Sequence, residues 1–212
     1  MKAETPDHRF SIDAAAFHID WKDIQLASNF GGYGLNANGG RAKSDGFEFT
    51  ATARPVRGLN LSLNGAYTNA RLTQDTPPEV GGKKGDRLPF SPKLSVGLNG
   101  DYSWLLATGI EAHVGASLRH LTRQKGSFDP DYITAFGRRA DIRAYSVVDL
   151  DAGLDFGHFS LDAYVKNLNN SHGVTDTNPY LVLHAFPINP NGALGTGIIR
   201  PRTIGLSLTA SY

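Results

Sequence analysis

Apolar and polar residues alternate along most of this 212-residue chain, and this period of two limits its fold more than any other feature. In the last segment, Ile204, Leu206 and Leu208 alternate with small polar residues, as they do on a β-strand whose two faces differ. Almost no window repeats apolar residues at the helical spacing of three and four. We therefore predict an all-β chain.

Eight segments show the alternation, and we expect each of them to form an antiparallel strand. In the first segment the apolar phase changes, since Phe10 and Ile12 fall on one face but Ile19 and Trp21 on the other. A β-bulge near Ala16 would explain this change. The segments cover approximately residues 9–26, 47–54, 59–68, 94–104, 110–119, 148–156, 159–166 and 203–212.

The connections between the segments alternate strictly between long and short. Long connections span residues 27–41, 72–90, 122–141 and 170–199, and the other three are tight turns. Long loops and short turns therefore lie at opposite rims, which is typical of outer-membrane barrels and rare in soluble β-sandwiches. We predict an antiparallel up-and-down transmembrane β-barrel segment of about eight strands, with long extracellular loops and short periplasmic turns.

The faces of the predicted strands suit a bilayer on one side and a water-filled lumen on the other. Asp149, Asp151, Asp155, Asp162 and Lys166 lie opposite in phase to the apolar residues, so they would face the lumen. Aromatic residues gather at both strand ends, as in the two girdles of a membrane barrel. They are Phe10, Trp104, Phe156, Phe159 and Tyr212 near the short turns, and Trp21, Phe47 and Tyr67 near the long loops.

Composition excludes several other classes of protein. The net charge of +1 gives no reason to expect nucleic-acid binding, and the lack of cysteine excludes disulfides, thiolate zinc sites and a cysteine nucleophile. No apolar stretch approaches the roughly 18 residues of a membrane-spanning helix. The first eight residues contain no signal-peptide pattern.

Few residues suggest a chemical site. The run 31–34 (GGYG) lacks the lysine and the following helix of a phosphate-binding loop. His18 with Asp20, and His113 with Glu111, could bind a metal, but no third and fourth ligand follow at strand spacing.

The acidic run at 149, 151 and 155 has no neighbouring nucleophile and is better explained as a solvated lumen wall. We therefore predict no catalytic residue, no metal site and no cofactor.

The long loops hold the best candidates for ligand recognition. Cationic and aromatic side chains at an extracellular mouth would suit an anionic iron chelate or a glycan, although ordinary loop composition explains them as well. The candidates are Arg123, Lys125, Phe128, Tyr132, Phe136, Arg138 and Arg139 in the third loop, and Tyr180, His184 and Phe186 in the fourth.

Several segments, in their order and spacing, resemble the C-terminal part of a TonB-dependent outer-membrane receptor. The aromatic Tyr212 at the end of a strand also resembles the signal that the outer-membrane assembly machinery recognises. The segments are residues 17–26 (FHIDWKDIQL), 42–48 (AKSDGFE), 85–93 (GDRLPFSPK), 164–170 (YVKNLNN) and 200–208 (RPRTIGLSL).

The resemblance implies what the chain does. The family's barrel has about 22 strands around a plug, so residues 1–212 would be its C-terminal part, without the plug domain, the signal sequence or the energy-coupling box. The resemblance implies a non-enzymatic receptor in the Gram-negative outer membrane that imports a siderophore-iron complex or a similar scarce nutrient. Its partners would be outer-membrane lipid, the remaining barrel and plug, the nutrient and, through the N-terminal part, the TonB energy-coupling complex.

Two other interpretations remain open from the sequence. The eight strands could close on themselves as a small outer-membrane barrel acting as an adhesin or structural protein, or form a soluble ligand-binding barrel with the apolar face inside. An open eight-stranded slice would leave two unpaired edges in lipid, at a cost of tens of kcal/mol, since each unpaired backbone group there costs several kcal/mol. The many small polar residues on the lumen face favour a slice of a larger barrel.

Overall fold

The structure, a computed structural model, describes residues 1–30, 33–178 and 195–211. Nearly all the regular structure in these residues is β-strand, as predicted, with one short helix, α1 (Pro130–Phe136). No helix among the described residues is long and apolar enough to cross a membrane. The strands are β1 (Lys2–Glu4), β2 (Phe10–Lys22), β3 (Gln25–Phe30), β4 (Tyr33–Asn38), β5 (Arg41–Ala53), β6 (Leu59–Leu72), β7 (Leu94–Ala107), β8 (Ile110–Leu121), β9 (Gln124–Lys125), β10 (Asp141–Ile142), β11 (Tyr145–Asp155), β12 (Phe159–Lys166), β13 (Val174–Asn178), β14 (Gly195–Ile198) and β15 (Thr203–Ala210).

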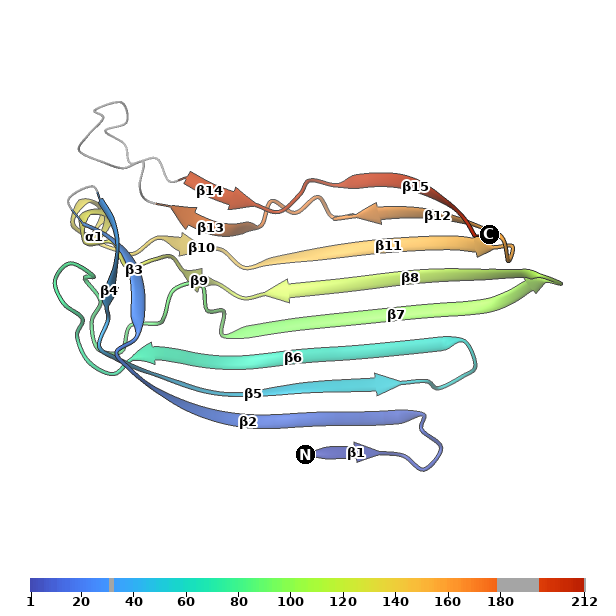
Figure 1. The fold of residues 1–212 in the computed structure, drawn as a ribbon, viewed down its shortest axis with the longest axis horizontal. Coiled ribbons are helices and arrows are strands. Elements are labelled where there is room, and N and C mark those ends of the chain that lie inside the picture. Colours follow the sequence, from blue (N-terminus) through green and yellow to red (C-terminus); the bar gives the residue numbers. More distant parts are fainter. Residues whose placement is uncertain (31–32, 179–194, 212) are drawn as a thin grey trace.

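The long strands form a single antiparallel sheet. Among the described residues its order is β1-β2-β5-β6-β7-β8-β11-β12-β15, which contains the eight predicted strands and the short β1. The hairpins β3–β4, β9–β10 and β13–β14 lie in long connections. Figure 1 shows the long connections at one end of the sheet and the tight turns at the other, so the predicted sorting of loops is confirmed.

The two faces of the sheet differ as the alternation predicts. On one face, which we call the apolar face, the side chains of Ile204, Leu206 and Leu208 are about three-quarters exposed. On the opposite, polar face, Lys166 Nζ lies 3.8 Å from Asp149 Oδ2. Exposed leucines on a regular sheet are expected where lipid rather than water covers them.

Stacked aromatic pairs mark both ends of the apolar face. Phe47 stacks on Tyr67 near the loops, with ring centroids 5.7 Å apart, and Tyr102 stacks on Trp104 near the turns at 5.2 Å. Tyr102 pairs with Leu59, eight residues before Tyr67 on β6, so the pairs are about 27 Å apart along the strand at about 3.4 Å per residue. With a strand tilt of about 40°, this is about 21 Å along the membrane normal, close to the roughly 25 Å apolar band of outer-membrane barrels.

The predicted β-bulge near Ala16 is wrong. β2 pairs with β5 without a break, from Phe10 opposite Ala53 to Lys22 opposite Arg41. Trp21 therefore lies on the polar face, opposite the buried Ala42, and not in the lipid-facing girdle. Trp21 and Ile19 are 40% and 39% exposed on this face and lie outside the loop core.

The sheet is open. β1 and β15 lie at its two ends and do not pair with each other in the part of the chain that the structure describes. The sheet therefore does not close on itself as a small barrel. In lipid the free edge of β15 requires a neighbouring strand, because its backbone groups would otherwise have no partner.

Two turn glycines test how tightly the short turns pack against the neighbouring strands. Gly58 and Gly109 have φ angles of 84° and 77°, which alanine adopts only with strain of roughly 1 kcal/mol. A Cβ on Gly58 would also lie 2.0 Å from the carbonyl oxygen of Ser103, whereas a Cβ on Gly109 would meet nothing within 4 Å. In a complete barrel that contains this chain, we expect Gly58→Ala to lower the temperature at which the barrel loses its compact electrophoretic form more than Gly109→Ala does. Equal shifts would contradict this packing of the turn.

Candidate ligand-facing surface

The polar face of the sheet carries connected charged side chains. His113 Nε2 lies 3.4 Å from Asp162 Oδ1 and 3.9 Å from Asp151 Oδ2, and the side chains of all three residues are about one-third exposed. Asp149 Oδ1 accepts a 2.7 Å hydrogen bond from the backbone N–H of Asn167. The acidic residues predicted to line a wet lumen therefore lie together on the expected face.

Glycines on this face make room for neighbouring side chains. A Cβ on Gly153 would lie 2.3 Å from Asp162 Oδ1 and 2.4 Å from His113 Cε1, and a Cβ on Gly115 would lie 2.5 Å from Asp151 Oδ2. The long side chains thus lie along the wall over glycine backbone. This explains the small residues that the sequence places on the lumen face.

The buried apolar core lies in the loops rather than in the sheet. Val80 and Phe128, from two different long loops, are fully buried and contact the ends of the strands. Ala42, Ala70 and Leu72 contribute from the polar-face side of β5 and β6. The loops therefore fold inward over the polar face. The complete loop core is Leu26, Ala42, Ala70, Leu72, Val80, Leu88 and Phe128.

The second long loop is joined to the edge of β6 by backbone hydrogen bonds. The N–H of Gly85 donates to Leu72 O at 2.9 Å, the N–H of Leu72 to Asp86 O at 2.8 Å, and the N–H of Leu88 to Ala70 O at 3.1 Å. The Gly85-to-Pro89 motif thus extends the sheet beyond the end of β7. This pairing holds Leu88 in the loop core.

The third long loop is held by α1 and by Arg139. The carboxylate of Asp129 caps α1 by accepting from the N–H of Tyr132 at 2.8 Å. The guanidinium of Arg139 lies 3.9 Å from the ring centroid of Phe128 and donates to the carbonyl of Arg87 at 2.6 Å. Burial lowers the pKa of Arg139 to about 10. Arg139 therefore joins two loops from the inside.

Three of the seven candidates in this loop face its interior. Phe128, Tyr132 and Arg139 are buried, so they stabilise the loop and are not available to a ligand. Arg123 is exposed, and Phe136 is 38% exposed and packs on Tyr132.

The two other cations of this loop pair with Asp141. Lys125 and Arg138 lie 2.8 and 3.5 Å from its carboxylate, and Lys125 in particular lowers the pKa of Asp141. Tyr180, His184 and Phe186 lie outside the described residues.

His18 and His113, which the sequence offered as possible metal ligands, contact aspartate side chains of the same chain. His18 Nδ1 lies 2.5 Å from Asp45 Oδ1 and its Nε2 3.1 Å from Asp20 Oδ2. His113 contacts Asp151 and Asp162 rather than Glu111. Within the described residues no group of three or more His, Cys, Asp or Glu could hold a metal ion.

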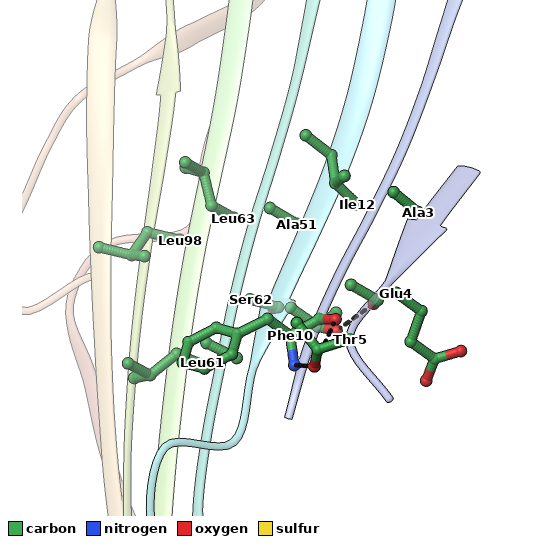
Figure 2. A pocket seen from close by; sticks show the side chains of 13 residues that line it. Ala3, Glu4, Thr5, Phe10, Ile12, Ala51, Leu61, Ser62, Leu63 and Leu98 are labelled. Carbon is green, nitrogen blue, oxygen red and sulfur yellow. Dashed lines mark hydrogen bonds between the residues drawn. The ribbon is translucent and has the colours of Figure 1, made fainter. Parts of the chain in front are cut away.

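A hollow of about 450 Å³ lies on the apolar face near the short turns. Figure 2 shows the side chains around it, among them Ile12, Ala51, Leu63 and Leu98 from four adjacent strands. The small Ala51 leaves the space between the larger side chains. Because this face is the one suited to lipid, an acyl chain fits the hollow better than a polar solute does.

The sequence analysis missed the residues that hold the loops, above all Val80, Leu88 and Arg87. Their only local signal is the motif from Gly85 to Pro89, which indicated a family but not a contact. Their packing depends on residues 40 to 60 positions away along the chain, such as Phe128 and Arg139.

Comparisons with known proteins agree with this architecture. The sequence model of the family described as TonB dependent receptor-like, β-barrel, matches residues 4–168. The metal-pseudopaline receptor CntO of Pseudomonas aeruginosa (strain UCBPP-PA14) is 27% identical over 213 residues, which is 100% of this chain and 27% of that receptor. The pesticin receptor of Yersinia enterocolitica is 32% identical over 94 residues, which is 44% of this chain and 13% of that receptor.

Solved structures share the fold. The ferric yersiniabactin uptake receptor FyuA from Yersinia pestis superposes with a TM-score of 0.74 and 22% identity, over 98% of this chain and 28% of that one. The copper transporter OprC superposes with a TM-score of 0.70 and 15% identity, over 100% of this chain and 30% of that one. This chain spans about a quarter of the length of the curated relatives that it matches along its whole length.

The two phenylalanines of the third loop offer a matched test of the loop core. In the full-length receptor we expect Phe128→Ala to expose the loop to added protease on intact cells, because replacing a fully buried phenylalanine costs about 3 to 5 kcal/mol. Phe136→Ala, a change of the same size at a partly exposed position, should leave protease resistance near that of the parent. Equal cleavage of both variants would show that Phe128 does not hold the loop.

Proposed function

This chain belongs to the TonB-dependent receptor β-barrel family, and we propose that it forms part of the wall and the extracellular loops of an outer-membrane importer. The cargo we propose is a siderophore-metal complex or a similar scarce nutrient. The observation that carries the proposal is an open sheet with one lipid-compatible face, one polar face, and loops folded inward over the polar face.

The rest of the receptor would complete the barrel. An open edge such as that of β15 is tolerated in lipid only when another strand pairs with it. In this proposal, strands outside the chain close the barrel, a plug fills its lumen, and the TonB energy-coupling complex acts on the part that holds the plug. The proposed location is the Gram-negative outer membrane.

A metal chelate is favoured as cargo by the relatives and by the exposed loop residues. The names of CntO and FyuA mention metal-pseudopaline and ferric yersiniabactin, and both proteins are named as receptors. In this chain Arg123 is exposed in the third loop, where a cation could meet an anionic chelate. We propose no catalytic residue and no resident cofactor.

Uptake by intact cells tests the proposed function. Deletion of the full-length receptor should abolish the uptake of at least one radiolabelled chelate from a panel of ferric, zinc and copper siderophores under metal limitation. Arg123→Gln should weaken uptake at low chelate concentration more than at saturation, since a loop contact acts on binding. Unchanged uptake of every chelate after deletion would contradict the proposed function.

Expression of the isolated chain tests whether it needs further strands. We expect residues 1–212 alone to give no heat-modifiable, protease-resistant monomer when refolded in detergent, because two sheet edges stay unpaired. The full-length receptor, refolded in the same detergent, is the control. A compact monomer from the isolated chain would show that these strands can close by themselves.

A further inference from the structure

The apolar face carries a cluster of charges above the aromatic pair near the loops. β2, β5 and β6 continue past Phe47 and Tyr67, and the side chains that follow on the same face are charged or polar. The cluster, which we call the outer charged patch, lies in three rows: His18, Asp45 and Asn69, then Asp20, Lys43 and Arg71, then Lys22 and Arg41.

The position of the patch is on the outside of the wall. Register places Lys43 and Arg71 on the face of Phe47 and Tyr67, whereas Ala42 and Leu72, one residue away, face the loop core. The loops fold over the polar face, so they leave the patch uncovered. Lys22 and Arg41 are exposed, and the side chains of Lys43 and Arg71 are about one-third exposed.

The patch has more cations than anions. Asp45 lies 3.9 Å from Lys43 and 3.8 Å from Arg71, and these contacts hold both cations against the sheet. Within the described part of the chain, Lys22 and Arg41 form no ion pair. Four cations therefore face two carboxylates, with the positive excess in the row farthest from the aromatic pair.

Arg87, on the loop segment that adjoins β6, lies opposite Arg71 and adds a cation beside the patch. Farther along the sheet, the described residues of β8 and β11 form no such cluster at this height. On the apolar face of β8 and β11, near their loop ends, His120 and Ser146 form a 2.8 Å hydrogen bond with each other. Charge is thus gathered on one sector of the wall. A general need for solubility above the membrane would not produce this local distribution.

The height of the cations above the lipid band favours one kind of headgroup. Lys43 and Arg41 lie four and six residues beyond Phe47, about 14 and 20 Å along the strand at about 3.4 Å per residue. With a strand tilt of about 40°, this is about 10 to 15 Å along the membrane normal. A phospholipid headgroup layer is only about 5 to 8 Å thick. The cations therefore match phosphates carried on a taller, sugar-based headgroup.

We propose that the outer charged patch binds the phosphate groups of an outer-leaflet glycolipid, with Lys22 and Arg41 as the principal contacts. Anionic headgroups are recognised by clustered Lys and Arg next to the membrane surface. The aromatic pair below would fix the level of the acyl chains, and the patch would fix the position of the sugar phosphates. The inference rests on the outer-membrane location of the proposed function.

The test is glycolipid binding by the full-length receptor in mild detergent. The probes are purified phosphorylated lipopolysaccharide, the same glycolipid after removal of its phosphates, and phosphatidylglycerol. Each cation near an anionic surface contributes about a fivefold change in binding, so Lys22→Gln with Arg41→Gln should weaken lipopolysaccharide binding about 25-fold. The control pair, Arg54→Gln with Arg57→Gln at the turn end of the same hairpin, should bind as the parent does.

Each outcome of this test decides the proposal. Weaker binding of lipopolysaccharide by the patch variant alone, with little binding of the dephosphorylated glycolipid or of phosphatidylglycerol, supports it. Equal binding by patch and control variants, or equal binding of the three lipids by the parent, overturns it. A single Lys22→Gln variant and the heat-modifiable form of each variant show that the barrel is intact. Chelate uptake, measured separately, fails if the proposed function is wrong even where glycolipid binding persists.

Discussion

The requirement that backbone N–H and C=O groups be paired inside a membrane determines this structure. In the nine-stranded sheet, every strand except β1 and β15 at its two ends lies between two others in an antiparallel ladder, which meets this requirement. At β15 the requirement is not met within the described residues, although the side chains there are those of a lipid-facing strand. The open edge, more than any single residue, connects the fold to a larger barrel.

Because the sheet separates lipid from an aqueous lumen, it has no apolar core of its own. Between the two aromatic pairs its leucines face outward and its carboxylates inward, and glycines such as Gly153 let long side chains lie along the wall. The loops extend beyond the lipid and fold in water, so they need a conventional core, which forms around Phe128 and Val80. One chain thus combines two opposite arrangements of apolar residues, separated by the aromatic pair of Phe47 and Tyr67.

This division changes how the loop residues are interpreted. Aromatic and cationic residues in a long loop suggest ligand recognition, yet Phe128 and Arg139 are used to hold two loops together. The side chains that remain available are those on the outside of the loop core, such as Arg123. On the outer side of the wall, charges in phase with lipid-facing residues mark the level where hydrocarbon ends.

The sequence by itself determined the strands, the sorting of loops and turns, and the two faces of most strands, because an alternation of period two is a local property that any strand pairing preserves. It also indicated the family through short motifs. The tertiary structure decided which face of the sheet the last residues of β2 occupy, since Trp21 lies on the polar face. It also decided that Phe128, Tyr132 and Arg139 are buried. The face of Trp21 follows from the unbroken pairing of β2 with β5. The burial of the three loop residues depends on contacts between segments far apart in the chain, and no local pattern encodes such contacts.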